Sequence, residues 1–142
     1  MSRLMQGNGD DYPDAAGKHM EDSNVLLAER RYDGAAYLAG YVVECALKTL
    51  IQLETGNAEH SHDLGGLCDQ LDRLAAQAGA RQGKVYLAAE AALRASTVLH
   101  NWRPEQRYRG PGVGAAEAGA WNQEAGFAYR KIIGKLRLAG AI

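Results

Sequence analysis

The sequence predicts an all-α fold, an antiparallel bundle of about five helices, and three observations favour it. No segment alternates apolar and polar residues convincingly with a period of two, so no β-sheet is expected. The stretch from residue 33 to 54 is apolar nearly all round, which is typical of a helix that neighbours bury on several sides. Cap and turn residues divide most of the remaining chain into segments of helical length.

Length and composition indicate a single domain over residues 13–142, preceded by a flexible N-terminal tail over residues 1–12. A chain of 142 residues can bury a core without metal or disulfide staples. The tail mixes Gly, Asn and Asp with few apolar anchors. It lacks a continuous apolar stretch, so we expect neither a signal peptide nor a membrane anchor there.

The charge balance restricts the classes of partner. Sixteen Lys and Arg residues face 17 Asp and Glu residues, for a net charge of −1. No overall basic field indicates a nucleic-acid binder, so any such site must be a local patch. Cys45 and Cys68 fall within predicted helices and resemble small core side chains rather than a disulfide framework. We therefore expect a cytoplasmic protein.

The first two predicted helices form an antiparallel hairpin. Pro13 suits the first turn of a helix, which then runs to about Arg31. Tyr32, Asp33 and Gly34 form a tight turn, with Asp33 as the N-cap of the central helix over residues 33–54. So short a link makes the two helices antiparallel.

Two charged residues in the central helix argue against a membrane span. Glu44 and Lys48 interrupt its apolar part before the ~20 residues that a bilayer crossing needs. Their spacing suits a helical ion pair, and we interpret Glu44 as structural, satisfied by Lys48 or by a neighbouring Arg or hydroxyl. Gly40 lies on a face of small residues, where a neighbouring helix or a second copy of the chain can come close.

A third helix is predicted from Leu64 to about residue 78. Gly56 ends the central helix, and Asp63 caps the next one. His60 and His62 lie between them near Asp63, but a full set of metal ligands at a recognised spacing is absent. We predict no metal and no cofactor, and the roles of the two histidines remain open.

Two further helices and a long loop complete the chain. Helices are predicted over residues 84–99 and 115–138, the second with basic residues near its C-terminal end. Residues 101–114 between them carry two prolines and three glycines, which indicates a loop. Bundle connections usually span about 2–8 residues, and longer loops in compact domains are often functional.

One stretch, residues 94–109, is chemically dense. It reads RASTVLHNWRPEQRYR and holds four arginines, one histidine and two aromatic residues against a single acid. Arginines supply forked donors for phosphate oxygens, and aromatic rings supply stacking faces for unpaired bases. The candidate RNA- or phosphate-binding residues are therefore Trp102, Arg103, Arg107, Tyr108 and Arg109.

A structural interpretation of the same residues stays open. Arg107 and Arg109 could pair with Glu44 and other acids, and Trp102 could plug the end of the bundle. The arginines would then serve intramolecular salt bridges only.

Three segments together resemble the HEPN domains (higher eukaryotes and prokaryotes nucleotide-binding), small helical bundles common in prokaryotes. They read AERRYDGAAYLAGYVVECALKTLI, HSHDLGGL and LHNWRPEQRYR, and the resemblance covers roughly residues 20 to 138. It implies a homodimer. A number of HEPN proteins are metal-independent ribonucleases that act as toxins in toxin–antitoxin pairs, often encoded beside a minimal nucleotidyltransferase that restrains them.

The resemblance also implies catalytic residues, because active HEPN proteins carry an Arg followed after four to six residues by a His. The match here is Arg94 with His100. His100 would be the general acid/base in attack of a ribose 2′-hydroxyl on the adjacent phosphate, and Arg94 would stabilise the phosphate charge. Active members usually carry a polar residue directly after the Arg, where this sequence has Ala95. In a regular helix Arg94 and His100 would lie about 120° apart, so they converge only if the helix ends near Leu99 or if a dimer completes the pair.

Two functions from different classes remain open. The first is a HEPN dimer that binds RNA or a nucleotide and cleaves RNA without metal. The alternative is a non-catalytic helical module that docks a partner protein, such as a nucleotidyltransferase, or binds a nucleotide. Solvent access to His100 beside Arg94 separates the two functions.

Overall fold

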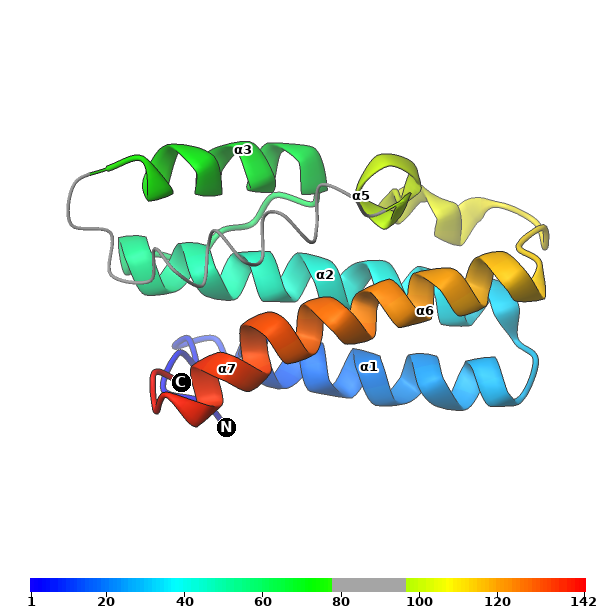
Figure 1. The fold of residues 1–142 in the computed structure, drawn as a ribbon, viewed down its shortest axis with the longest axis horizontal. Helices are drawn as coiled ribbons and strands as arrows, with labels where there is room; N and C mark the ends of the chain where they lie inside the picture. The colour runs from blue at the N-terminus through cyan, green and yellow to red at the C-terminus, as the bar shows by residue number, and fades with distance from the viewer. Residues whose placement is uncertain (78–96) are drawn as a thin grey trace.

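Three long helices form most of the bundle in the computed structural model, which describes residues 1–77 and 97–142 (Figure 1). They are α1 (Tyr12–Ala28), α2 (Tyr32–Thr55) and α6 (Ala115–Tyr129). A fourth, α3 (Leu64–Ala75), lies along the side of α2 opposite α1. Shorter elements are α5 (Thr97–Asn101), the 3₁₀ turn η1 (Pro104–Tyr108), the π turn η2 (Arg130–Gly134) and α7 (Lys135–Leu138). The described ranges contain no strand, which confirms the predicted all-α fold. The helix predicted over residues 84–99 lies outside the described residues except at its C-terminal end.

The predicted hairpin of α1 and α2 is confirmed, but its turn lies earlier than predicted. α1 ends at Ala28 rather than at Arg31 because Arg30 adopts the left-handed conformation, with φ of 59°. α2 begins at Tyr32, so Asp33 belongs to its first turn and makes no side-chain cap. The Asp33 carboxylate instead accepts hydrogen bonds from the amides of Gly112 and Val113 at 3.0 and 3.1 Å.

α2 is the core of the bundle. Every residue from Val42 to Gln52 is buried, and the helix ends at the left-handed Gly56 as predicted. By length and composition α2 could also cross a membrane, although the sequence analysis took Glu44 and Lys48 as evidence against this. However, 78% of the most apolar 18-residue stretch of α2 is buried inside the bundle. That burial accounts for the composition, because a helix covered on several sides is apolar nearly all round.

Trp102 fills the small-residue face of α2 that the sequence analysis assigned to a neighbouring helix or a second chain. Its side chain is 1% exposed, and the indole Nε1–H donates to the carbonyl oxygen of Tyr37 at 3.0 Å. A Cβ atom on Gly40 would lie 2.0 Å from that nitrogen. Gly40 is therefore required because the indole ring lies directly against the α2 backbone.

The chain ends contact each other and the bundle. The Arg3 guanidinium donates to the carbonyl of Gly140 at 2.9 Å, and the Gln52 amide donates to the carbonyl of Leu4 at 3.0 Å. The two termini lie side by side in Figure 1. Tyr12 already belongs to α1 and is buried, so the bundle begins one residue before the predicted boundary; flexibility of the preceding residues stays a prediction.

Replacing Gly40 by Ala should lower the free energy of unfolding by about 2 kcal/mol or more, because the new methyl group displaces the indole and breaks its hydrogen bond. Chemical denaturation measures the change. Gly119→Ala in α6 is the matched control: a Cβ there meets nothing within 4 Å, so the better helix propensity of Ala should stabilise the protein by up to about 1 kcal/mol. Equal stability of the two variants would contradict this role of Gly40.

Candidate functional site

The sequence from α5 to α6 is attached to the bundle at three points. The Val98 amide donates to the Glu124 carboxylate of α6 at 3.1 Å, and Trp102 binds α2 as described above. Beyond η1, the amides of Gly112 and Val113 bind Asp33. These contacts fix both ends of the predicted loop, so its middle part is held on the surface of the bundle.

His100 is exposed because of its position in α5. Val98 of α5 and Trp102, the residue directly after it, are both buried and lie four residues apart, so they lie on the same, inner side. His100 is two residues from each, which places it about 160–200° round the axis, and its side chain is exposed. Arg94 lies outside the described residues, so of the predicted catalytic pair only His100 has a described position.

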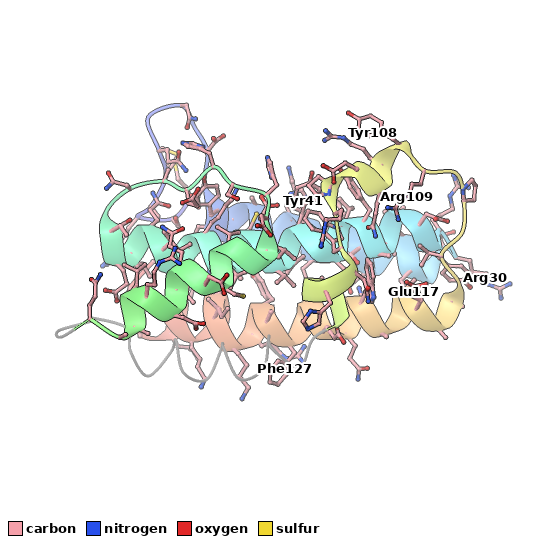
Figure 2. The ribbon with its side chains drawn as sticks, turned by 90° about the horizontal axis from the view of Figure 1, so that it is seen from above. Arg30, Tyr41, Tyr108, Arg109, Glu117 and Phe127 are labelled. Carbon is pink, nitrogen blue, oxygen red and sulfur yellow. The ribbon has the colours of Figure 1, made fainter. Side chains whose placement is uncertain are left out.

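Four exposed residues follow Trp102 and form what we call the arginine surface: Arg103, Arg107, Tyr108 and Arg109. Tyr108 is 76% exposed, and Figure 2 shows Tyr108 and Arg109 projecting from the loop. The Arg107 guanidinium carbon lies 4.9 Å from the centre of the Tyr108 ring. Within the described ranges none of the three arginines has a carboxylate within salt-bridge distance. This group of positive charges is therefore uncompensated by described acids.

Trp102 does not belong to this surface, although the sequence analysis proposed its ring as a stacking face for a base. The indole is buried against Gly40, Tyr37 and Tyr41, with the Trp102 and Tyr41 ring centroids 4.9 Å apart. A base cannot reach it without opening the bundle. Its role is the structural one that the sequence left open: Trp102 holds the loop on α2.

The buried carboxylate of Glu44 has two partners. Lys48 Nζ lies 2.8 Å from Glu44 Oε1, and both side chains are at most 5% exposed. The second partner is His62 Nδ1, at 3.0 and 3.1 Å from the two carboxylate oxygens. The structural interpretation of Glu44 is thus confirmed. Arg107 and Arg109 do not pair with Glu44, so the pairing with this acid that the structural interpretation of residues 94–109 allowed is wrong.

The contact of His62 with Glu44 was not predicted from the sequence. Because a carboxylate only accepts hydrogen bonds, Nδ1 of His62 carries the hydrogen, and Nε2 is left for solvent or a ligand. The His62 side chain is 58% exposed. One signal could have indicated the contact: a carboxylate inside so apolar a helix requires partners, and His62 stands in the polar link directly after it.

The Tyr41 ring lies next to aromatic rings from four segments: α1, α2, the α2–α3 connection and, through Trp102, the loop after α5. Its ring centroid lies 5.1 Å from Tyr37, 5.5 Å from His19 of α1 and 6.5 Å from His62. The hydroxyl oxygens of Tyr37 and Tyr41 are 3.0 Å apart. Burial raises the pKa of Tyr41, and the hydrogen bond with Tyr37 raises it further, so Tyr41 keeps its proton at neutral pH.

Cys45 and the histidines provide little for metal chemistry. Burial, and then the charge of Glu44, raises the pKa of Cys45 to about 12, so its thiol stays protonated in the core. Across residues 1–77 and 97–142, no three His, Cys, Asp or Glu side chains lie close enough to hold a metal ion.

A comparison with protein-family models matches residues 11–118 to the HEPN domain. The chain belongs to the HEPN family. The match includes the helices α1, α2, α3 and α5 and the arginine surface, and it ends within the first turns of α6. It begins earlier and ends earlier than the resemblance that the sequence analysis described. Comparisons with curated proteins and with solved structures find no significant match.

Replacing Glu44 by Ala in this HEPN protein should lower the free energy of unfolding by about 3–5 kcal/mol, because it leaves the Lys48 ammonium buried without its counter-charge. Urea denaturation measures the loss. Glu44→Met combined with Lys48→Met should recover most of it, since an apolar pair fits the same core. Glu117→Ala, at an exposed position, is the control and should change stability by less than about 1 kcal/mol. A loss as small as that of the control would contradict the role of the pair.

His19 should make stability depend on pH. Burial, and then the charge of Lys18, holds the pKa of His19 below its ordinary value of 6.5. The unfolded chain therefore binds more protons, and the contribution of neutral His19 is present above pH 6.5 and lost as pH falls through the lowered pKa. Denaturation between pH 7.5 and 4.5 should show this slope for the wild type and for His60→Gln, and a reduced slope for His19→Gln. An unchanged slope in His19→Gln would refute the contribution of His19 to the pH dependence of stability.

Proposed function

We propose that this HEPN protein binds single-stranded RNA at His100 and the arginine surface and cleaves it without a metal ion. One observation carries the proposal: an exposed histidine stands on the same short stretch as three exposed arginines that lack a described acidic partner. A chain with a net charge of −1 thus places a local basic patch beside an exposed imidazole, a side chain that can serve as a general acid or base.

The arginine surface suits an unpaired strand. Arginine guanidinium groups donate in pairs to phosphate oxygens, and such contacts provide affinity without reading sequence. The exposed Tyr108 ring, next to the Arg107 guanidinium, supplies a face on which a base can stack. Both features favour a strand whose bases are unpaired over a duplex.

The cleavage step uses the 2′-hydroxyl of RNA itself. His100 takes the proton from this hydroxyl as its oxygen attacks the adjacent phosphorus atom, and the bond from phosphorus to the 5′-oxygen breaks. The leaving 5′-oxygen takes up a proton, so the products are a 2′,3′-cyclic phosphate and a 5′-hydroxyl. Arg94 has the proposed role of stabilising charge on the phosphate oxygens.

The proposal includes a cytoplasmic homodimer that acts as the toxin of a toxin–antitoxin pair. Membership of the HEPN family supports the dimer, because members commonly dimerise or pair with nucleotidyltransferases. Cys45 is a buried thiol that forms no disulfide, which agrees with a reducing compartment. A nucleotidyltransferase is the proposed protein partner.

Incubation of labelled single-stranded RNA with purified protein and excess chelator tests the activity. The wild type should cut the RNA, and His100→Ala and Arg94→Ala should each reduce the rate by a factor of about 10² or more. His60→Ala, which removes an exposed histidine elsewhere, should cut normally. The same strand with 2′-deoxyribose at every position should bind and stay intact.

Each outcome of this test has a defined meaning. Equal rates for the wild type and His100→Ala would overturn the proposed catalytic role of that residue. Binding of RNA without cleavage by any form would leave a nucleic-acid-binding module, and no binding at all would favour the docking of a partner protein.

A further inference from the structure

A second group of polar side chains lies beside the arginine surface, and the proposed function does not use it. Tyr37 and Tyr41 of α2 form its centre, flanked by His19 of α1 and by His62 from the connection before α3. Arg107 of η1 reaches it from the arginine surface. We call these five residues the tyrosine cluster. Figure 2 places Tyr41 between the α2–α3 connection and the loop that carries Tyr108 and Arg109.

The two tyrosine hydroxyls leave one hydrogen-bond donor unused. Their oxygens are 3.0 Å apart, so one hydroxyl donates to the other. Since Tyr41 keeps its proton, the pair holds two protons and spends only one on the internal bond. The other proton can point to a ligand.

Arg107 brings a positive charge to these hydroxyls. Hydrogen bonds to the side chains of Tyr108 and Tyr37 raise the pKa of the Arg107 guanidinium, so the group is charged under all ordinary conditions. A guanidinium group has five N–H donors, so the contacts with these tyrosines leave donors for a third partner. The only partners described for Arg107 are these tyrosines, and neither of them is a carboxylate.

The carboxylate beneath the cluster does not make the cluster acidic. Glu44 forms its ion pair with Lys48 at 2.8 Å, which cancels its charge. His62 binds Glu44 through Nδ1 and therefore presents its other ring nitrogen, Nε2, outward. The balance of formal charges around the tyrosines is therefore positive, which favours an anion.

His19 supplies a separate sign of a missing partner. Its Nδ1 atom is buried and makes no hydrogen bond within the described residues. Buried polar atoms of this kind are rare, and each calls for a partner such as a water molecule or a ligand. The His19 ring lies next to that of Tyr41, so this atom belongs to the same cluster.

We propose that the tyrosine cluster binds one phosphate group of a nucleotide or of an RNA strand. Arg107 and the free tyrosine hydroxyl would donate to the phosphate oxygens, with His62 and His19 at the border of the site. The inference rests on the proposed function in one respect, because Arg107 belongs both to the arginine surface and to the tyrosine cluster. A strand on the arginine surface would continue over α2 toward His62.

Binding measurements on two hydroxyl variants test the site. Tyr37→Phe and Tyr41→Phe remove the donors and keep the rings that pack against Trp102. The probes are adenosine 5′-monophosphate, adenosine, and a 2′-deoxy oligonucleotide that the protein cannot cleave, each titrated by calorimetry. Each variant should weaken binding of the phosphate-bearing probes by a factor of about 10 or more, because a hydrogen bond to a charged group is lost. Tyr32→Phe is the matched control and should bind like the wild type.

The two ligand sources and the two proposals can be told apart. Loss of nucleotide binding identifies a free nucleotide as the ligand, whereas loss of oligonucleotide binding alone identifies a phosphate of the RNA strand; either result supports the site. Unchanged binding of both probes in Tyr37→Phe and Tyr41→Phe overturns it, even if the protein cuts RNA. Hydroxyl-dependent binding of adenosine as tight as that of its monophosphate also overturns it, because the phosphate would then not be the group that the hydroxyls bind. Hydroxyl-dependent binding by a protein that cuts no RNA would sustain the site and reject the proposed cleavage.

Discussion

The contact between the Trp102 indole and the α2 backbone at Gly40 determines where the candidate functional residues can lie. The ring occupies space that any side chain at position 40 would take, and its N–H satisfies the carbonyl of Tyr37. Asp33 binds the far end of the same loop. Both attachments fall on the first turns of α2, so one rigid helix supports the whole arginine surface from beneath. Because α2 holds this loop in place, the exposed residues of the loop need few contacts with one another to keep their positions.

The same helix carries a second constraint one turn further on. Glu44 is a carboxylate in the apolar core, and only the combination of Lys48 and His62 makes its burial tolerable. The pair with His62 also orients an imidazole at the protein surface, next to Tyr41. Thus the buried carboxylate of Glu44 orients the exposed imidazole of His62, and the tyrosine cluster depends on this contact.

Most of the fold could be predicted from local sequence signals, whereas contacts between residues far apart in the sequence could not. The N-terminal turn at Pro13 and the left-handed cap at Gly56 follow from residue type. The left-handed Arg30 gives no such signal, because Gly or Asn usually occupies that conformation, and the end of α1 was misplaced for this reason. The contact of Trp102 with Tyr37 spans 65 residues and that of His62 with Glu44 spans 18. Periodicity and composition cannot specify either contact, so a buried tryptophan was taken for a binding residue.

The distribution of ion pairs gives the strongest physical argument for a ligand. The buried acid nearest the tyrosine cluster is neutralised by Lys48 from its own helix, four residues away, and is therefore not available to the arginines. Exposed charges without an acidic partner among the described residues contribute little to stability, and substitutions among them usually change it by less than about 0.5 kcal/mol. Arg103, Arg107 and Arg109 therefore contribute little to the free energy of folding. They do place three exposed positive charges above α2, and a group of like charges of this kind attracts anions.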